Sequence, residues 1–150
     1  MNLYKRMAFI HVSGPATTEA FAKLASTAIA AGSALALTSG YLAQATVASL
    51  RIAGVAIQKI ASTDGDFASA TSIPVIIPGE EDVFEATVSG TATVSLIGDQ
   101  FDLTATNQGT AQAVNLSGTT NKVVTMVGFI SSSLILVKFN SNYVYANKAN

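Results

Sequence analysis

Few residues of this chain belong to the types that carry out chemistry. The sequence has one histidine, His11, and no cysteine. A catalytic histidine needs a nucleophile or a carboxylate beside it, and no sequence motif supplies such a partner for His11. Its position two residues after Phe9, in an alternating segment, is typical of a structural histidine. We therefore expect no catalytic residue and no enzymatic activity.

The acidic residues offer two further kinds of chemistry. Glu80, Glu81 and Asp82 form the densest charged run, directly after a Pro-Gly pair. Such a run suits a solvated turn, or a subunit contact with Lys or Arg. Calcium is the other ligand to consider, since 64–66 reads Asp-Gly-Asp, but the twelve-residue loop with its terminal Glu is absent. We expect no metal and no cofactor.

One more carboxylate pair flanks Phe101. Spacing alone leaves Asp99 and Asp102 compatible with glycoside hydrolysis, which uses two carboxyl groups. No other motif points to an active-site cleft. Chemistry is therefore not where the sequence is most informative.

The composition points to assembly. Charged residues make up 11% of the 150 residues, against about 25% in typical soluble proteins. Eight of the nine acids lie in 64–102, whereas the basic residues lie on either side. Such segregation suits copies that meet positive flank to negative middle, although the fold can also interleave the two signs. No basic stripe with aromatic residues exists, so we expect no nucleic-acid partner.

Membrane insertion and export are not expected. Residues 24–50 carry no charge, but Ser, Thr and Gln interrupt the run and Gly32 and Gly40 break it. The apolar stretch 7–12 follows Lys5 and Arg6 but is too short for a signal peptide. We expect a protein made in the cytoplasm of its host cell.

The elements that must position these residues are mostly strands. Residues 7–12 alternate as a strand, and 35–37 with 41–48 form a hairpin around Ser39-Gly40. Between 50 and 57 the bulky positions change parity at Gly54, which predicts a bulge. Pro74 and Pro78 bracket a short run that belongs at a sheet edge or a crossing. Short strands are also expected at 101–103 and 114–116.

Two further hairpins follow from alternation. Phe84, Ala86 and Val88 would face Leu96, Val94 and Ala92 across a three-residue loop at 89–91, with one long strand kinked at Gly90 as the rival. Strands at 122–130 and 134–139 would pair across 131–133, with Phe129 opposite Ile135. Both faces of this second hairpin are largely apolar, which predicts cover on both sides.

One helix is the exception. Thr17 or Thr18 can cap a helix over 17–31, with Glu19 in its first turn and Gly32 at its end. The alanines of this segment suit a strand equally well. The pattern as a whole predicts an all-β fold, an antiparallel barrel or sandwich with an extended N-terminal arm and at most one short helix.

The N-terminal arm, residues 1–16, is the strongest candidate for contact with a partner. Lys5 and Arg6 supply charge, while Tyr4, Phe9 and Ile10 supply apolar anchors, and Ser-Gly-Pro at 13–15 can act as a hinge. The arm either docks on its own domain, residues 17–150, or reaches a neighbour by strand addition. With Glu80, Glu81 and Asp82, these residues form the expected partner interface.

Several stretches resemble a known family. Residues 28–35 lead through Gly40 to a Gly-Val-Ala return at 54–56, and 73–75 with 83–86 have a similar character. This pattern is similar to the small decoration, or cement, proteins of tailed-bacteriophage heads. The resemblance implies a mostly β protein that binds the outside of a capsid as an oligomer and stiffens it.

The expected function is therefore structural. The chain would be a virion protein on the capsid exterior, with the major capsid protein and copies of itself as partners, in a homo-oligomer such as a trimer. Two alternatives stay open. One is a carbohydrate- or receptor-binding β module of a phage fibre or tail. The other is a subunit of a tube or pilus that polymerises alone.

Overall fold

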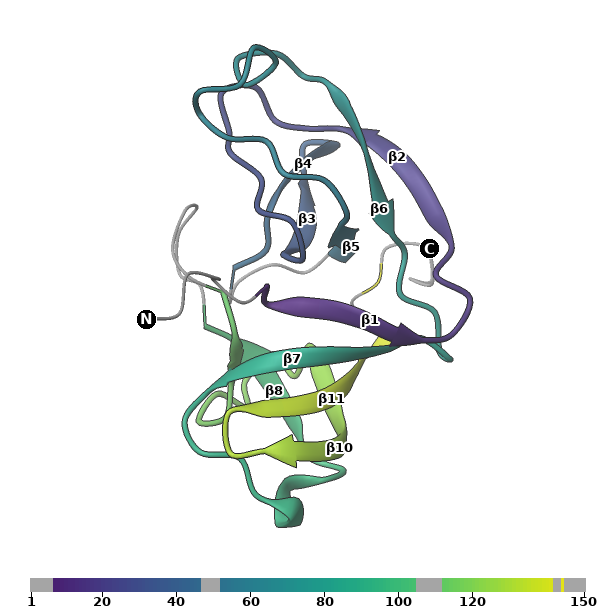
Figure 1. Cartoon of the computed structure of the whole chain (residues 1–150), viewed down its shortest axis with the longest axis vertical. Helices are drawn as coiled ribbons and strands as arrows, with labels where there is room; N and C mark the ends of the chain where they lie inside the picture. The colour runs from purple at the N-terminus through teal and green to yellow at the C-terminus, as the bar shows by residue number, and fades with distance from the viewer. Residues whose placement is uncertain (1–6, 47–51, 105–111, 142–143, 145–150) are drawn as a thin grey trace.

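The computed structural model describes residues 7–46, 52–104, 112–141 and 144. Strands dominate this part of the chain (Figure 1), which confirms the expected all-β barrel class. Its elements are β1 (Phe9–Ser13), β2 (Thr18–Ala22), β3 (Ala34–Thr38), β4 (Tyr41–Gln44), β5 (Ile52–Ala56), β6 (Ser72–Ile76), β7 (Val83–Ser89), the 3-10 turn η1 (Val94–Leu96), β8 (Gln100–Leu103), β9 (Val114–Asn115), β10 (Val124–Ser131) and β11 (Leu134–Phe139). Among the described residues no helix is long and apolar enough to cross a membrane.

Strands β7 to β11 form a closed barrel, called here the second barrel. The strand order is β7-β11-β10-β8-β9, and β9 pairs in parallel with β7 to complete the ring. The other four pairings of the ring are antiparallel. Closure leaves the ring without a free strand edge for another chain to extend.

Strands β2 to β6 form the first barrel, which lies above the second in Figure 1. Their order is β2-β6-β5-β3-β4. The ring is completed at the end of β2, where Lys23 forms a parallel bridge with Leu42. The Leu24 N–H also donates to the Leu42 carbonyl over 2.9 Å. Each barrel therefore uses five consecutive strands and one parallel contact between its first and third strands.

The two barrels match strand for strand and in register. When β2 to β6 are aligned with β7 to β11 in chain order, every pairing of the first ring has its counterpart in the second. Equivalent pairs, the first barrel before the second, are Leu35–Gly54 and Phe101–Val124, Ala56–Val75 and Met126–Val137, Phe21–Ile73 and Ala86–Ile135, Leu37–Leu42 and Leu103–Val114, and Lys23–Leu42 and Val88–Val114.

Hydrogen bonds outside the strands repeat in the same way. Gly32 N–H donates to the Ala56 carbonyl, and Gly98 N–H donates to the Met126 carbonyl, each over 2.8 Å. Both glycines have positive φ, at +80° and +98°. The same topology, register and turn geometry recur over 18–76 and 83–138. The chain is thus an internal structural duplication.

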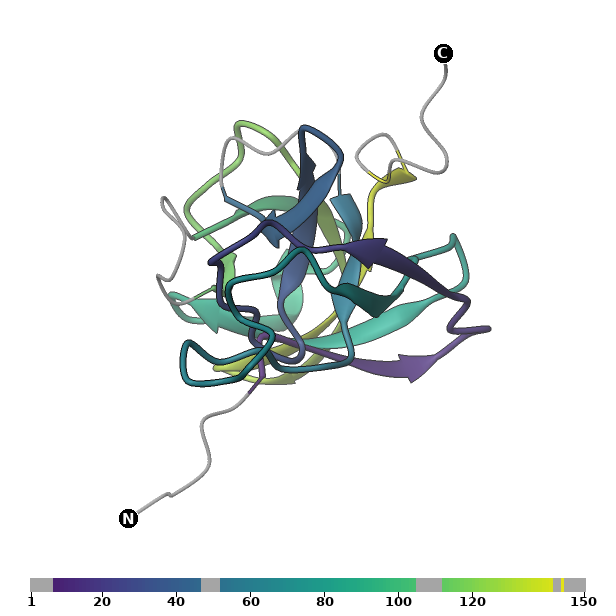
Figure 2. The ribbon, with the colours of Figure 1, turned by 90° about the horizontal axis from the view of Figure 1, so that it is seen from above.

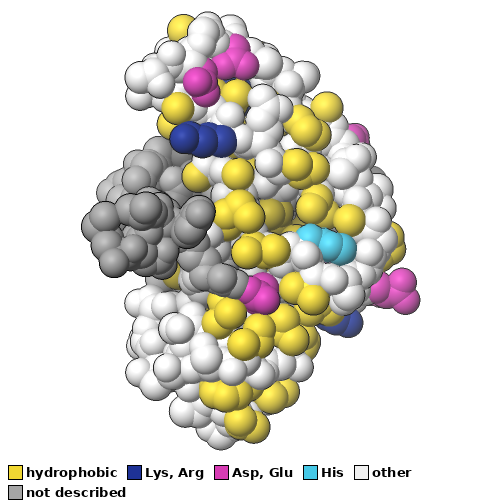
Figure 3. Space-filling model, in the orientation of Figure 1, with side chains coloured by type: hydrophobic (Ala, Val, Ile, Leu, Met, Phe, Trp, Pro, Cys, Tyr) yellow, Lys and Arg dark blue, Asp and Glu magenta, His cyan; other side chains and the backbone are white. Residues whose placement is uncertain are grey.

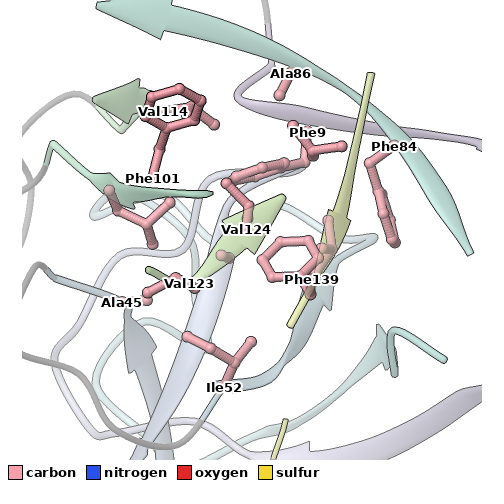
Figure 4. Close-up of a cluster of buried hydrophobic side chains, with 14 of the residues drawn as sticks. Phe9, Ala45, Ile52, Phe84, Ala86, Phe101, Val114, Val123, Val124 and Phe139 are labelled. Carbon is pink, nitrogen blue, oxygen red and sulfur yellow. The ribbon is translucent and has the colours of Figure 1, made fainter. Parts of the chain in front are cut away.

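A shared core joins the two barrels. The first barrel encloses Leu35, Leu42, Ile73 and Val75 in a cluster of its own. The other faces of β3 and β5 present small side chains toward the second barrel, where they join its buried cluster (Figure 4). These contributors are Ala34, Ala36, Ala45, Ile52 and Val55. Close packing of many small apolar groups therefore holds the barrels together, as the aromatic-poor composition requires.

β1 joins the second barrel along the edge of β7. Phe9 faces Ala86 and His11 faces Phe84 in an antiparallel pairing with a bulge after His11. The strand crosses between the barrels (Figures 1 and 2). Residues 9–13 of the expected arm are therefore part of the folded unit, whereas 1–6 lie outside the described residues.

The helix expected over 17–31 is wrong, and the strand alternative is confirmed for part of the segment. β2 covers Thr18–Ala22 and pairs with β6. Beyond it the chain turns and forms an isolated bridge from Ile29 to Ile60. Helix signals such as a capping threonine are local and weak, and they lose to a strand partner supplied from elsewhere in the chain.

The hairpin expected over 84–96 is also wrong. Phe84 and Ala86 are buried as the alternation predicts, but β7 takes β1 and β11 as neighbours. Residues 94–96 form η1, so the rival of one long kinked strand is wrong too. Alternation fixes which face of a strand is buried, but it does not name the partner strand.

The remaining hairpins agree more closely. β3 and β4 pair across Ser39-Gly40, both with positive φ, as a two-residue turn requires. The bulge near Gly54 lies at Ala53 and keeps Ile52 and Val55 in one cluster. β10 and β11 pair Phe129 with Ile135 as expected, although the register shifts at 127 and 130.

The proline prediction needs correction. β6 lies between β2 and β5, so it is not an edge strand. Its pairing with β5 involves only Val75 and Ile76, so Pro74 faces a strand neighbour on the β2 side alone. A proline is tolerated there because no ladder bond to β5 is required at that position.

Candidate functional site: an interaction surface

The acidic run 80–82 divides into exposed and buried members. Glu80 and Glu81 are exposed, in the turn between β6 and β7 where acidic side chains project from the surface (Figure 3). Asp82 is only 1% exposed. Glu80 and Glu81 therefore stay candidates for a partner contact, whereas Asp82 is an internal group and its side chain is not free for one.

Asp82 ties three segments together. Its Oδ1 accepts hydrogen bonds from His11 Nε2 and from the Ala16 N–H, both over 2.9 Å, and its Oδ2 accepts from the Gly79 N–H over 2.8 Å. Gly14, with φ of +106°, passes so close that a Cβ there would lie 2.5 Å from Oδ1. The carboxylate thus fastens the β1–β2 connection to the β6–β7 turn.

The electrostatics of Asp82 fit this role. Burial opposes ionisation of the carboxyl group, but the two backbone N–H donors and His11 outweigh it and lower the pKa of Asp82 below its ordinary value. The carboxylate form is the form that these donors need. Asp82 therefore stays ionised and accepts hydrogen bonds near neutral pH.

His11 is held as a structural residue. Its ring meets Phe84 edge-to-face at 5.3 Å as well as bonding Asp82. A catalytic triad would add a hydroxyl bonded to the imidazole, and no hydroxyl of the described residues bonds this ring. The His-Asp geometry by itself stabilises the strand crossing.

Phe9 and Ile10 differ in their availability. Phe9 is 1% exposed and packs its ring 4.9 Å from that of Phe139, in the core between the barrels (Figure 4). It is therefore an anchor on its own domain, not a surface contact. Ile10 is half-buried on β1. Tyr4, Lys5 and Arg6 lie outside the described residues, and their contact role stays a prediction.

Asp102, the other buried carboxylate, is also committed internally. Its Oδ1 accepts from the N–H groups of Asn121 and Lys122 over 2.7 Å, and its Oδ2 accepts from Thr120 over 3.1 Å. Asp102 therefore fixes the loop before β10. Within the described part of the chain, no group of three or more His, Cys, Asp or Glu could hold a metal.

Two buried polar residues were missed by sequence reasoning. Gln112 bridges the barrels, because its Oε1 accepts from the Ala34 N–H over 2.7 Å and its Nε2 donates to the carbonyls of Ala34 and Ala45 over 3.1 and 3.0 Å. Lys23 is fully buried and donates to the carbonyls of Leu24 and Phe67. A lone Gln or Lys carries no spacing signal, so only the tertiary fold reveals these roles.

The exposed surface of the second barrel carries an apolar group that we call the β10 patch. Its residues lie on β10 and on the neighbouring η1 segment, and Figure 3 shows hydrophobic side chains gathered over these elements at the lower end of the molecule. Its members, between 38% and 62% exposed, are Val94, Ile97, Val127, Phe129 and Ile130. The cover expected on both faces of this hairpin is present on one face only within the chain.

Together these features define a class of protein: an all-β chain of two matched barrels, whose buried ionisable groups hold its own loops and whose exposed face is apolar and poor in charge. Comparison with protein-family models, curated proteins and solved structures finds no match for the chain. The case for its function therefore rests on its own residues.

Proposed function

We propose that this chain is a structural virion protein that binds the outer surface of a capsid as an oligomer and stabilises the head lattice. The observation that carries the proposal is the surface. Large apolar side chains stand exposed on a chain that is 11% charged, while single exposed apolar residues on an ordinary monomer would be dispersed among charges. Such a surface favours contact with other subunits.

The interior supports the same proposal. Within the described residues every buried side-chain N or O atom has a hydrogen-bond partner. The buried carboxylates Asp82 and Asp102 bind backbone N–H groups of their own chain. The polar interior is thus used for rigidity, which suits a part that must hold its shape on a lattice.

The mechanism is additive and needs no chemical step. Each copy covers a moderate apolar area at the junction of capsid subunits. Binding to the assembled lattice, and not to dissociated subunits, stabilises the lattice by mass action. The exposed Glu80 and Glu81 are available for Lys or Arg of a neighbour, and Lys5 and Arg6 for acidic groups.

The test uses undecorated heads of a tailed phage whose genome encodes the chain. We expect the purified protein to bind these heads and to raise the temperature at which they release DNA, with a larger shift at higher free protein concentration. Dissociated capsid subunits are the matched control and should not bind. Absence of binding to the intact heads would refute the proposal.

The carbohydrate-binding alternative predicts a different outcome. Glycan-binding modules place aromatic rings on the surface, and Tyr41 is the exposed tyrosine among the described residues. A glycan array should therefore show no specific ligand if the structural role is correct. Spontaneous growth of long polymers from the purified chain would instead favour the tube or pilus alternative.

A further inference from the structure

The duplication allows each surface of one barrel to be compared with its counterpart in the other. The two barrels differ most at the connection between their fourth and fifth strands. In the first barrel, β5 and β6 are joined by residues 57–71, whereas in the second, β10 and β11 are joined by Ser132 and Ser133 alone. This difference leaves one barrel end covered and the other bare.

The long connection covers the end of the first barrel. Ile60 is 2% exposed and forms a two-way backbone bridge with Ile29, and Phe67 packs against the same cluster. Buried Lys23 fastens this cover, since its Nζ donates to the Phe67 carbonyl over 2.7 Å and lies 5.5 Å from the centre of the Phe67 ring. The covering material is apolar and comes from this chain.

The second barrel has no such cover. Val88 occupies the position equivalent to Lys23, so a cation to fasten a loop is missing there. Ile130, at the position equivalent to buried Ile60, is 44% exposed. With its neighbours it forms the β10 patch. The apolar surface that is buried within one barrel is therefore presented to the outside by the other.

We propose that a second copy of this chain covers the β10 patch, by patch-to-patch contact about a twofold axis. The charges favour this occupant, because residues 89–98 and 126–137 contain no Asp, Glu, Lys or Arg. Two copies that meet here bring no like charges together, and a charged partner would find no counter-charge in these segments. Phe129 and Ile130 are the central anchors of the contact.

This inference deepens the proposed function, on which it rests, by naming the surface through which copies associate. Its test needs no capsid. Sedimentation velocity over a concentration series should show self-association of the wild-type chain. The double variant Phe129→Glu/Ile130→Glu should weaken association about thirtyfold or more, because it would bury unpaired charges at the centre of the contact. Ile57→Glu, at a comparably exposed position on the first barrel, is the matched control and should associate as the wild type does.

A second measurement does not depend on adding charge. The chain has no cysteine, so Val94→Cys provides the single thiol of the protein. A short thiol-reactive crosslinker should join two copies of this variant and leave Ile57→Cys monomeric. Circular dichroism of each variant checks that the strands remain.

Three results would overturn the inference. The first is a wild-type chain that stays monomeric at about 1 mM, where even weak association is populated. The second is unchanged association of the double variant. The third is a monomeric chain whose patch variants lose binding to heads, which would assign the patch to the capsid protein. Association through the patch without binding to heads would leave this inference standing and refute only the proposed function.

Discussion

Asp82 and His11 show how ionisable residues are used in this protein. They lie 71 positions apart and meet over 2.9 Å where β1 passes the β6–β7 turn. The sequence correctly predicts a structural role for His11, because no catalytic partner accompanies it. It does not reveal Asp82 as that structural partner, since an acidic run beside Pro-Gly suggests a solvated turn. Burial of a single member of the run depends on which segments pack above it.

We expect Asp82→Asn to lower the free energy of unfolding by about 1–3 kcal/mol, because one backbone N–H would face an amide NH2 in place of a carboxylate oxygen. Urea unfolding followed by circular dichroism measures this. Glu81→Gln, at the exposed neighbour, should change stability little. Equal losses in both variants would contradict the internal role of Asp82.

The same variant should change the pH dependence of stability. The pKa of Asp82 is lower in the folded chain than its ordinary value of 3.8, so the carboxylate contributes stability that is fully present above that value. This contribution is lost as pH falls through the folded pKa. Between about pH 5 and pH 2, the stability of the wild type should therefore decrease more than that of Asp82→Asn.

At the scale of elements, local turn signals predicted well and pairing did not. The β3–β4 hairpin follows from Ser39-Gly40, because few residue pairs adopt two positive φ angles so readily. The 84–96 hairpin failed because Gly90 suggested a similar turn, whereas Ala92 N–H bonds the Ser132 carbonyl of a distant hairpin. Long-range partners compete with local ones, and alternation gives both the same apolar face.

Gln112 is the polar link between the two barrels and provides a test at this scale. Gln112→Ala would leave the N–H of Ala34 and the carbonyls of Ala34 and Ala45 without their present partner. We expect a loss of about 2–3 kcal/mol in the free energy of unfolding, measured by urea titration. Gln100→Ala, at an exposed position, is the control. A loss of less than half this size would contradict the bridging role.

At the scale of the whole molecule, the duplication is the main feature that sequence inspection did not detect. Residues 32–38 and 98–104 read GSALALT and GDQFDLT, and Gly, Leu and Thr coincide at three equivalent positions. Elsewhere the barrels share strand register but few residue types. A small barrel needs apolar side chains facing inward, and many combinations of Ala, Val, Ile, Leu and Phe satisfy that need.

We expect the two barrels to unfold in one cooperative transition. The buried cluster that contains Phe9, Phe84 and Phe139 also contains Ala34, Ile52 and Val55 of the first barrel, so separation of the barrels would expose a large part of the core. Scanning calorimetry should give equal calorimetric and van't Hoff enthalpies. Two resolved transitions would show that the barrels are independent.

The sequence by itself determined the class of the fold, the weak chemistry and the low charge of the surface. These properties follow from composition, from alternation with period two and from Ser and Gly turns, all of which act locally. Only the tertiary structure decided that the strands close into two matched barrels, that Phe9 and Asp82 are internal, and that one barrel end is covered while the other is bare. Each of these depends on contacts between residues far apart in the chain, and pairing of that kind is selected by the free energy of the whole packed core.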